Sequence, residues 1–444
     1  MTRLDLLGPT GVSLAIRLLG IALNFAALLV LARAVDPATL GLWAWAGEVV
    51  ALLCVLSAAG FNMIAIRVVP DCLIGRDRAG LRRFVRAGLL AGLAGSAIFG
   101  AALLLAWSAG WLLPGVDAAM LALMAAVLLA FTALRFSQEV MRGAGRMVLA
   151  QVGEQVVWPL ALLAAALGLW LAPFEGSAAA LLLAAQLLVF GGFWALLAAI
   201  SDRIADDILL PASTAPVRVR SWLAGAVPLA VCAGLSVLLK RGDIIALGAF
   251  ADAREVAFYT PASRFAALLV LGQAAASMVS AGRLREYWRV GNRAALQLSL
   301  DQMAAISVLF ALPFCVFFWL LPAPLLGLFG AEFTAAAGVL QVLAAAQLVN
   351  CWTGPVACAV VACDLERVFM AMTAAAAALL IAALALLVPR WGMIGAALAS
   401  LAGISALNLG MAAIVRRRTG LICWARPAGF AQLLGHGLLK ARAR

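Results

Sequence analysis

Long apolar runs separated by short polar connections make up almost the whole sequence. The runs show no alternation of apolar and polar positions, so they favour helices over the strands of a membrane barrel. A bilayer core of about 30 Å is crossed by about 20 apolar residues in a helix. The pattern therefore predicts about twelve membrane-spanning helices, at 8–33, 40–65, 87–109, 116–138, 148–171, 178–200, 221–250, 256–282, 298–321, 334–360, 367–388 and 392–415.

The connections between these spans alternate between rich and poor in arginine and lysine. The basic connections are 66–86, 139–147, 201–220, 283–297 and the tail from residue 416. Because positive loops stay in the cytoplasm, we expect both termini there, in a multi-pass protein of the bacterial inner membrane. The first apolar run is too long for a cleavable signal peptide and contains Arg17, so we interpret it as the first membrane helix.

Composition agrees with this interpretation. Of the 444 residues, 66% are hydrophobic and 12% are charged, whereas soluble domains are about half apolar and about one-quarter charged. The net charge of +12 follows from the membrane topology and from anionic lipid headgroups. It gives no support to nucleic-acid binding.

An internal repeat divides the predicted helices into two halves. At an offset of 216 residues, Asp36 aligns with Asp252, Arg67 with Arg283, and proline and glycine positions align further along. Six helices per half give a parallel repeat. We therefore predict an all-α polytopic membrane protein of two six-helix bundles around a central cavity. Its parts are an N-terminal lobe at 1–200, a cytoplasmic linker at 201–220, a C-terminal lobe at 221–416 and a basic cytoplasmic tail at 417–444.

Ionisable residues inside the predicted spans are the candidate functional groups. They are Arg17, Glu48, Lys240, Arg241, Asp243 and Arg264. Each costs about 2.5–3.5 kcal/mol at the centre of a lipid-facing helix, so we expect them to face one another or a watery cavity. Asp243 either neutralises Arg264 or Lys240 as a structural pair or acts in the cavity.

The excess of positive charge suits an anionic cargo, because arginine offers forked donors and lysine a mobile point charge. Glu48 either pairs with a positive group in its own bundle or couples transport to protons. Asn24 either lines the cavity or bonds helix to helix. Glu139 and Glu154 are interpreted as residues at the membrane boundary.

Four segments together resemble a known family. They are LLVLARAVDPATLGLWAWA at 28–46, RGAGR at 142–146, RGDIIALGAFADAREVAFYTPASRF at 241–265 and VPRWGMIGAALAS at 388–400. With Arg17 and Asn24 in the first helix, the chain resembles the polysaccharide flippases of the multidrug/oligosaccharidyl-lipid/polysaccharide (MOP) exporter superfamily, over residues 8–416. Position 41 is glycine, whereas the aligned position 257 is alanine and departs from the family's pattern.

The resemblance implies a transporter that moves undecaprenyl-diphosphate-linked oligosaccharide, an O-antigen or exopolysaccharide unit, by alternating access driven by an ion gradient. It implies cargo binding by the cationic residues Arg17, Lys240, Arg241 and Arg264, together with Asn24 and Asp243, and ion coupling at Glu48 or Asp243. The implied partners are the lipid-linked anionic oligosaccharide, membrane lipids, a polysaccharide polymerase and glycosyltransferases.

Three alternatives stay open: a multidrug exporter of the same superfamily, a membrane polymerase or glycosyltransferase, and a scaffold without transport. Enzymes of the second kind usually carry a sizeable loop outside the membrane, which the predicted spans do not leave, so we expect no catalytic residue.

The eight cysteines form no CxxC pair and the sequence has one histidine, so we expect neither a metal site nor a cofactor. Two further C-terminal spans would be expected of a lipid II flippase, and the twelve predicted spans do not include them, which weakens that interpretation.

Overall fold

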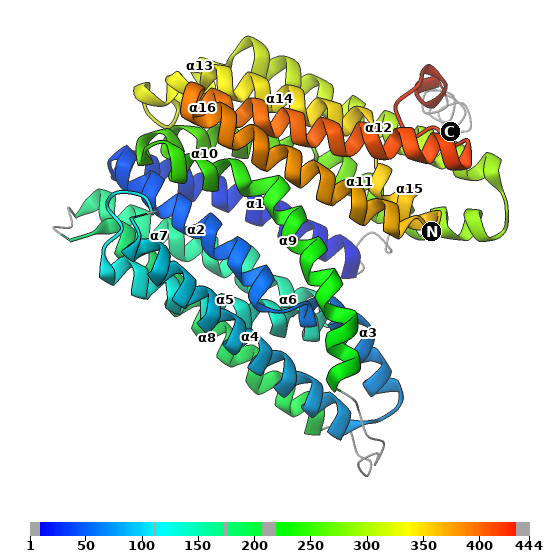
Figure 1. The fold of residues 1–444 in the computed structure, drawn as a ribbon, viewed down its shortest axis with the longest axis horizontal. Helices are drawn as coiled ribbons and strands as arrows, with labels where there is room; N and C mark the ends of the chain where they lie inside the picture. The colour runs from blue at the N-terminus through cyan, green and yellow to red at the C-terminus, as the bar shows by residue number, and fades with distance from the viewer. Residues whose placement is uncertain (1–8, 111, 173–175, 207–218, 432–444) are drawn as a thin grey trace, which may run out of the picture. The chain divides into compact units, whose positions relative to one another are not determined.

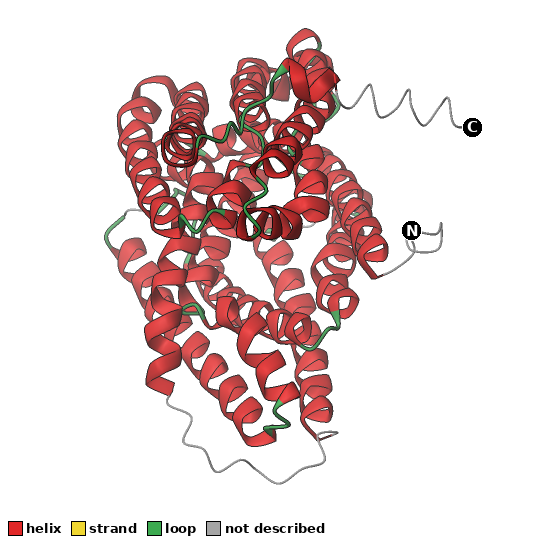
Figure 2. Ribbon diagram, turned by 90° about the vertical axis from the view of Figure 1, so that its right-hand side faces the viewer, coloured by secondary structure: helices red, strands yellow, loops and turns green. Residues whose placement is uncertain are grey.

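The computed structural model describes residues 9–110, 112–172, 176–206 and 219–431 (Figure 1). Every regular element in these ranges is a helix (Figure 2). Nine helical segments within them are long and apolar enough to cross a bilayer. The prediction of an all-α polytopic membrane protein is therefore confirmed.

In the first half, each predicted span corresponds to one helix or to a helix with a break. The helices are α1 (Pro9–Ala34), α2 (Pro37–Ser57), α3 (Phe61–Ile74), α4 (Arg78–Ser108), α5 (Ala118–Gly143), α6 (Met147–Val152), the π-helical turn η2 (Gly153–Val157), α7 (Trp158–Leu171) and α8 (Ala178–Asp206). The fifth predicted span is thus continuous through α6, η2 and α7.

The second half contains more breaks. Its helices are α9 (Val219–Phe250), α10 (Ala253–Leu268), α11 (Leu271–Arg289), α12 (Arg293–Leu320), α13 (Pro322–Gly327), the 3₁₀ turn η3 (Ala331–Ala336), α14 (Ala337–Trp352), α15 (Val356–Ala362) and α16 (Glu366–Thr419). The predicted span at 256–282 is divided between α10 and α11.

Aspartate side chains begin several of the spans. Asp36, Asp77 and Asp117 each accept a hydrogen bond from a backbone N–H three residues ahead, at 3.0, 2.7 and 2.7 Å. Such caps satisfy one of the free N–H groups at a helix start. Burial opposes ionisation of Asp36, but hydrogen bonds from the Thr39 hydroxyl and backbone outweigh it and lower the pKa of this carboxyl. The polar connections seen in the sequence therefore set the helix starts.

The longest helix, α16, consists of two antiparallel arms, which lie side by side in Figure 1, in orange and red-orange. The backbone leaves helical geometry at Gly392, where φ is 52° and ψ is −131°. Small residues of the second arm then pack against the first arm in reversed order: Gly395 on Leu387, Gly403 on Leu380 and Gly410 on Met372. Two separate spans, predicted at 367–388 and 392–415, therefore form a tight hairpin.

Contacts divide the chain into two compact units. Unit 1 contains residues 1–237 and 252–257, and unit 2 contains 238–251 and 258–444. The division falls inside α9, whereas the predicted linker at 201–220 lies largely outside the described residues. The predicted lobe boundaries stay a prediction.

Aromatic and small side chains hold unit 1 together. Phe84 packs between Phe61 and Phe136, with ring centroids 5.9 and 5.8 Å away, and Trp222 meets its edge at 5.2 Å. Gly41 of α2 lies against the backbone of Ala253, so close that a Cβ atom would overlap the carbonyl oxygen. This contact explains why residues 252–257 belong to unit 1.

Candidate functional site

A polar group occupies the membrane-spanning part of unit 1. Arg135 of α5 forms an ion pair with Glu154 of η2, with 2.9 Å between Nη2 and Oε1. The Arg135 guanidinium also lies 5.1 Å from the centre of the Phe131 ring. Single π-helical turns inside α-helices are frequent at functional sites. Here the π turn carries the acidic partner of a cation inside a membrane span.

The next turn of α5 extends this polar group. Arg142 pairs with Glu139 three residues before it. Gln138 is 1% exposed, and neither its amide oxygen nor its amide nitrogen has a hydrogen-bond partner among the described residues. A buried polar group without a partner costs about 1–3 kcal/mol. Gln138 therefore marks a position where a water or a polar ligand would be stabilised.

Helix α1 packs directly on the π turn. A Cβ atom at Gly20 would lie 2.9 Å from the Gln155 side-chain oxygen, so the two backbones approach closely. Arg17 and Asn24 lie three and four residues from Gly20, on the same side of α1. Both are exposed, and Asn24 donates a hydrogen bond to the Gly20 carbonyl at 2.9 Å. The structure thus brings the predicted residues of α1 beside the turn that holds Glu154.

Asp243 is the centre of a second polar group, in unit 2. Its side chain is 7% exposed. One carboxylate oxygen accepts hydrogen bonds from the Tyr259 hydroxyl at 2.6 Å and the Ser400 hydroxyl at 2.9 Å. The other accepts from the Ile244 N–H at 2.8 Å. Helices α9, α10 and α16 therefore meet at one buried acid.

The remaining predicted residues differ in exposure. Lys240 and Arg264 are exposed, Arg241 is half-buried, and Glu48 is 4% exposed. Among the six ionisable candidates, the buried groups are thus the two carboxylates. Within the described ranges, no group of three or more histidine, cysteine, aspartate or glutamate side chains could hold a metal ion.

Several site residues escaped the sequence analysis. Arg135 lies inside a predicted span and could have been found by the same search that found Arg17. Glu154 was assigned to the membrane boundary because it begins a span, and the π turn gave no sequence signal. Tyr259 and Ser400 were missed because hydroxyl partners carry no charge, although Tyr259 aligns with Trp43 in the repeat.

No protein-family model matches the sequence, and no curated protein matches it. Solved structures do share the fold. An inward-facing multidrug resistance MATE family transporter of the MOP superfamily has 14% identity and a TM-score of 0.65, over 92% of this chain and 97% of that chain. The lipid II flippase MurJ, in an inward closed conformation, has 13% identity and a TM-score of 0.67, over 92% of this chain and 87% of that chain.

A third similar structure is a MOP superfamily transporter from Pyrococcus furiosus, described as having a binding pocket of reverse polarity. It has 14% identity and a TM-score of 0.56, over 91% of this chain and 97% of that chain. At such identities the likeness concerns the fold alone. The chain is a multi-pass membrane protein with the two-lobe helical fold of these transporters.

Proposed function

We propose that this protein is a transporter that moves a lipid-linked anionic oligosaccharide across the bacterial inner membrane. The similar folds belong to proteins that move multidrug substrates or lipid II, and they support transport in general. The choice of an anionic, lipid-linked cargo rests on the charged residues of this chain and on the family resemblance in its sequence. A polysaccharide polymerase and glycosyltransferases would be its functional partners.

The observation that carries the proposal is the exposure of cationic side chains within the predicted membrane spans at 8–33, 221–250 and 256–282. Arg17, Lys240 and Arg264 are exposed, although each would cost about 2.5–3.5 kcal/mol if it faced lipid near the bilayer centre. A hydrated path for cargo removes this cost. The diphosphate of the cargo gives the same guanidinium and ammonium groups an anionic ligand.

Asp243 and Glu48 would then couple transport to an ion gradient. Gain of a proton or a cation neutralises a buried carboxylate, and its loss restores a charge that is costly in an apolar environment, so either event has a large electrostatic effect. Binding of the coupling cation or proton at such a group changes the stability of its surroundings, as coupling requires. The Tyr259 and Ser400 hydroxyls would keep Asp243 oriented during this change.

A second candidate is a multidrug exporter for cationic compounds. The specific observation in its favour is that Glu48 and Asp243 are the buried ionisable candidates, and carboxylates suit cationic drugs. The two candidates differ in the sign of their cargo. They are therefore separated by which substitutions abolish which transport activity.

The deciding experiment is complementation of a strain that lacks this protein. We expect Arg17→Ala and Arg264→Ala to abolish surface polysaccharide and to leave lipid-linked oligosaccharide on the cytoplasmic leaflet. Arg254→Ala is the matched control, because Arg254 is exposed and lies at the start of α10, next to the connection from α9. All variants should insert at wild-type levels.

If both Arg17→Ala and Arg264→Ala produce wild-type amounts of surface polysaccharide, the proposed cargo is refuted. We expect the wild-type protein to confer no resistance to cationic dyes. If it does confer resistance, and Asp243→Asn abolishes that resistance, the multidrug function replaces the flippase function. Dissipation of the proton gradient in vesicles should slow translocation. If only sodium matters, coupling to protons is wrong.

A further inference from the structure

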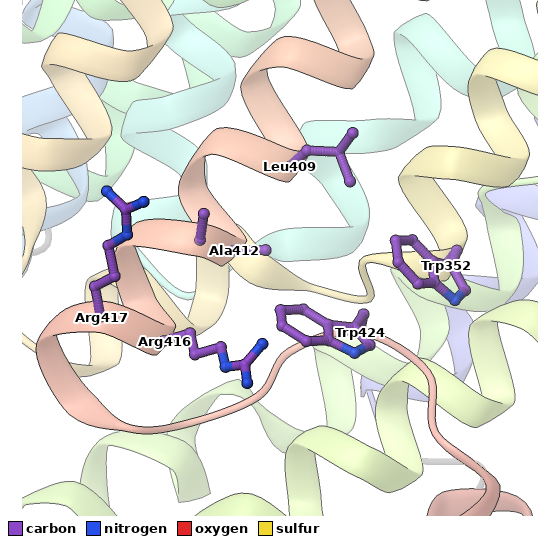
Figure 3. A pocket seen from close by; sticks show the side chains of 7 residues that line it. Trp352, Leu409, Ala412, Arg416, Arg417 and Trp424 are labelled. Carbon is purple, nitrogen blue, oxygen red and sulfur yellow. The ribbon is translucent and has the colours of Figure 1, made fainter.

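A pocket of about 540 Å³ lies at the C-terminal end of α16, in unit 2 (Figure 3). Its walls are the indole rings of Trp352 and Trp424, which stack with centroids 6.2 Å apart. Leu409 and Ala412 of the second arm of α16 form an apolar floor. None of these residues belongs to the polar groups described above.

Two arginines form the charged side of the pocket. Arg416 and Arg417 both line it. Figure 3 shows the Arg416 side chain extending toward Trp424, whereas the Arg417 side chain extends away from it. The Arg416 guanidinium lies 5.3 Å from the centre of that ring. With Arg418, they give the last turn of α16 three consecutive positive charges.

The walls are held in position by the chain that follows α16. The Ala425 N–H donates to the Trp352 carbonyl at 2.8 Å, which joins the two tryptophan segments. Gln297 of α12 accepts from the Ile422 N–H at 2.8 Å and donates to the Ile422 carbonyl at 2.8 Å. The pocket therefore has a fixed wall before any ligand binds.

We propose that this pocket binds one anionic glycerophospholipid. The phosphate would bind the guanidinium group of Arg416, Arg417 would add positive charge at the pocket edge, and an acyl chain would lie along Leu409 and Ala412. The tryptophan rings suit the level of the headgroups, where amphipathic aromatic side chains concentrate. Position also fits, because α16 ends here after a span of apolar residues.

The chemistry of the pocket selects this occupant over the other candidates. A free phosphate would leave the apolar floor without a ligand. The chain's own C-terminal segment, residues 432–444, contains His436, Lys440 and two arginines but no acidic residue, so like charge disfavours it. A zwitterionic lipid would lack the net negative charge that two arginines favour.

The test is native mass spectrometry of the delipidated full-length protein, titrated with phosphatidylglycerol. We expect one tightly bound molecule, and about 30-fold weaker binding in the double variant Arg416→Gln/Arg417→Gln. Arg418→Gln removes the same kind of charge from the same helix turn without altering the pocket lining, and it should keep wild-type affinity. Ala413→Trp, at another pocket-lining position, should block binding while all three arginines remain.

Three results would overturn the proposal. Equal binding of phosphatidylcholine would mean that the negative headgroup is not recognised. Displacement of the lipid by glycerol phosphate at equal concentration would show that the pocket recognises only a phosphate. Wild-type affinity in both the arginine double variant and Ala413→Trp would show that the lipid lies elsewhere. The outcome is independent of the cargo, because polysaccharide export is not the readout.

Discussion

The segment after α16 is held to unit 2 by a buried ion pair, and its removal gives a quantitative prediction. Asp301 of α12 is 3% exposed, and both of its oxygens pair with the Arg426 guanidinium, one of them at 3.1 Å from Nε. Gln297 adds a bond to the same carboxylate at 2.9 Å. Arg426→Ala leaves this carboxylate buried without its cation.

The expected cost follows from the burial of the pair. Loss of one partner of a fully buried pair costs about 3–5 kcal/mol. The Arg426 side chain is 30% exposed, so we expect about 2–3 kcal/mol. Opening of the segment at 421–426 should therefore become about 30- to 150-fold more frequent.

Cys423 reports this opening. It is 1% exposed and free, so a maleimide reaches it only when the segment opens. Labelling of the native protein, followed by peptide mass spectrometry, gives the rate at each cysteine separately. Cys423 should react about 30- to 150-fold faster in Arg426→Ala, while Cys54 of unit 1 keeps its wild-type rate.

Arg418→Ala is the matched control, because it removes an exposed arginine from the nearby end of α16. It should leave Cys423 protected. The reasoning is refuted if Arg426→Ala is folded and labels Cys423 at the wild-type rate. Equal acceleration in both variants would show that loss of positive charge, rather than loss of the pair, opens the segment.

Three further predictions follow from other contacts. Gly41→Ala should destabilise the protein by more than about 1–3 kcal/mol, because its Cβ would overlap the backbone of α10; Gly47→Ala in the same helix meets nothing within 4 Å and should be neutral or stabilising in the same thermal unfolding assay. Tyr259→Phe removes a hydroxyl bonded to a buried carboxylate and should cost about 1.5–3 kcal/mol, whereas Tyr287→Phe, at the only other tyrosine, should leave the melting temperature unchanged; equal shifts would contradict this. Burial, with nearby Cys363 and Asp301, raises the pKa of Cys423 from 9.0 to about 12. Because the folded-state pKa is the higher one, docking of residues 421–426 keeps its full stability below about pH 9 and weakens by about 1.4 kcal/mol per pH unit above it. Hydrogen exchange of this segment, corrected for the intrinsic rate, should show this loss between about pH 9 and pH 11.

Most of the spans could be predicted from the sequence, because apolar length alone determines a membrane helix. The predicted spans at 221–250 and 256–282 are not among the nine segments of the described residues that are long and apolar enough to cross a bilayer. The turn between the arms of α16 could be placed as well, since Pro389 and Gly392 interrupt the apolar run there. The break between α10 and α11 could not, because neither composition nor length changes at residues 269–270. Hydropathy indicates whether a segment lies in the membrane, but it gives little information on where one helix ends and the next begins.

The candidate site was less accessible to sequence analysis. The groups at Arg17 and Asp243 were found because a charge inside an apolar run is visible by itself. The partners of Asp243 could not be predicted, since Tyr259 and Ser400 lie 16 and 157 residues away from it in the sequence. The pairing of Asp301 with Arg426 spans 125 residues, so only the folded chain brings these charges together.

The α16 hairpin limits where anything can travel through the protein. Its arms meet at glycines, and at Gly403 a single added carbon would already lie 3.2 Å from the Leu380 side chain. Packing this close leaves no space for a bulky molecule between the arms at these glycines, so a route for such a molecule would have to run along the outside of the pair.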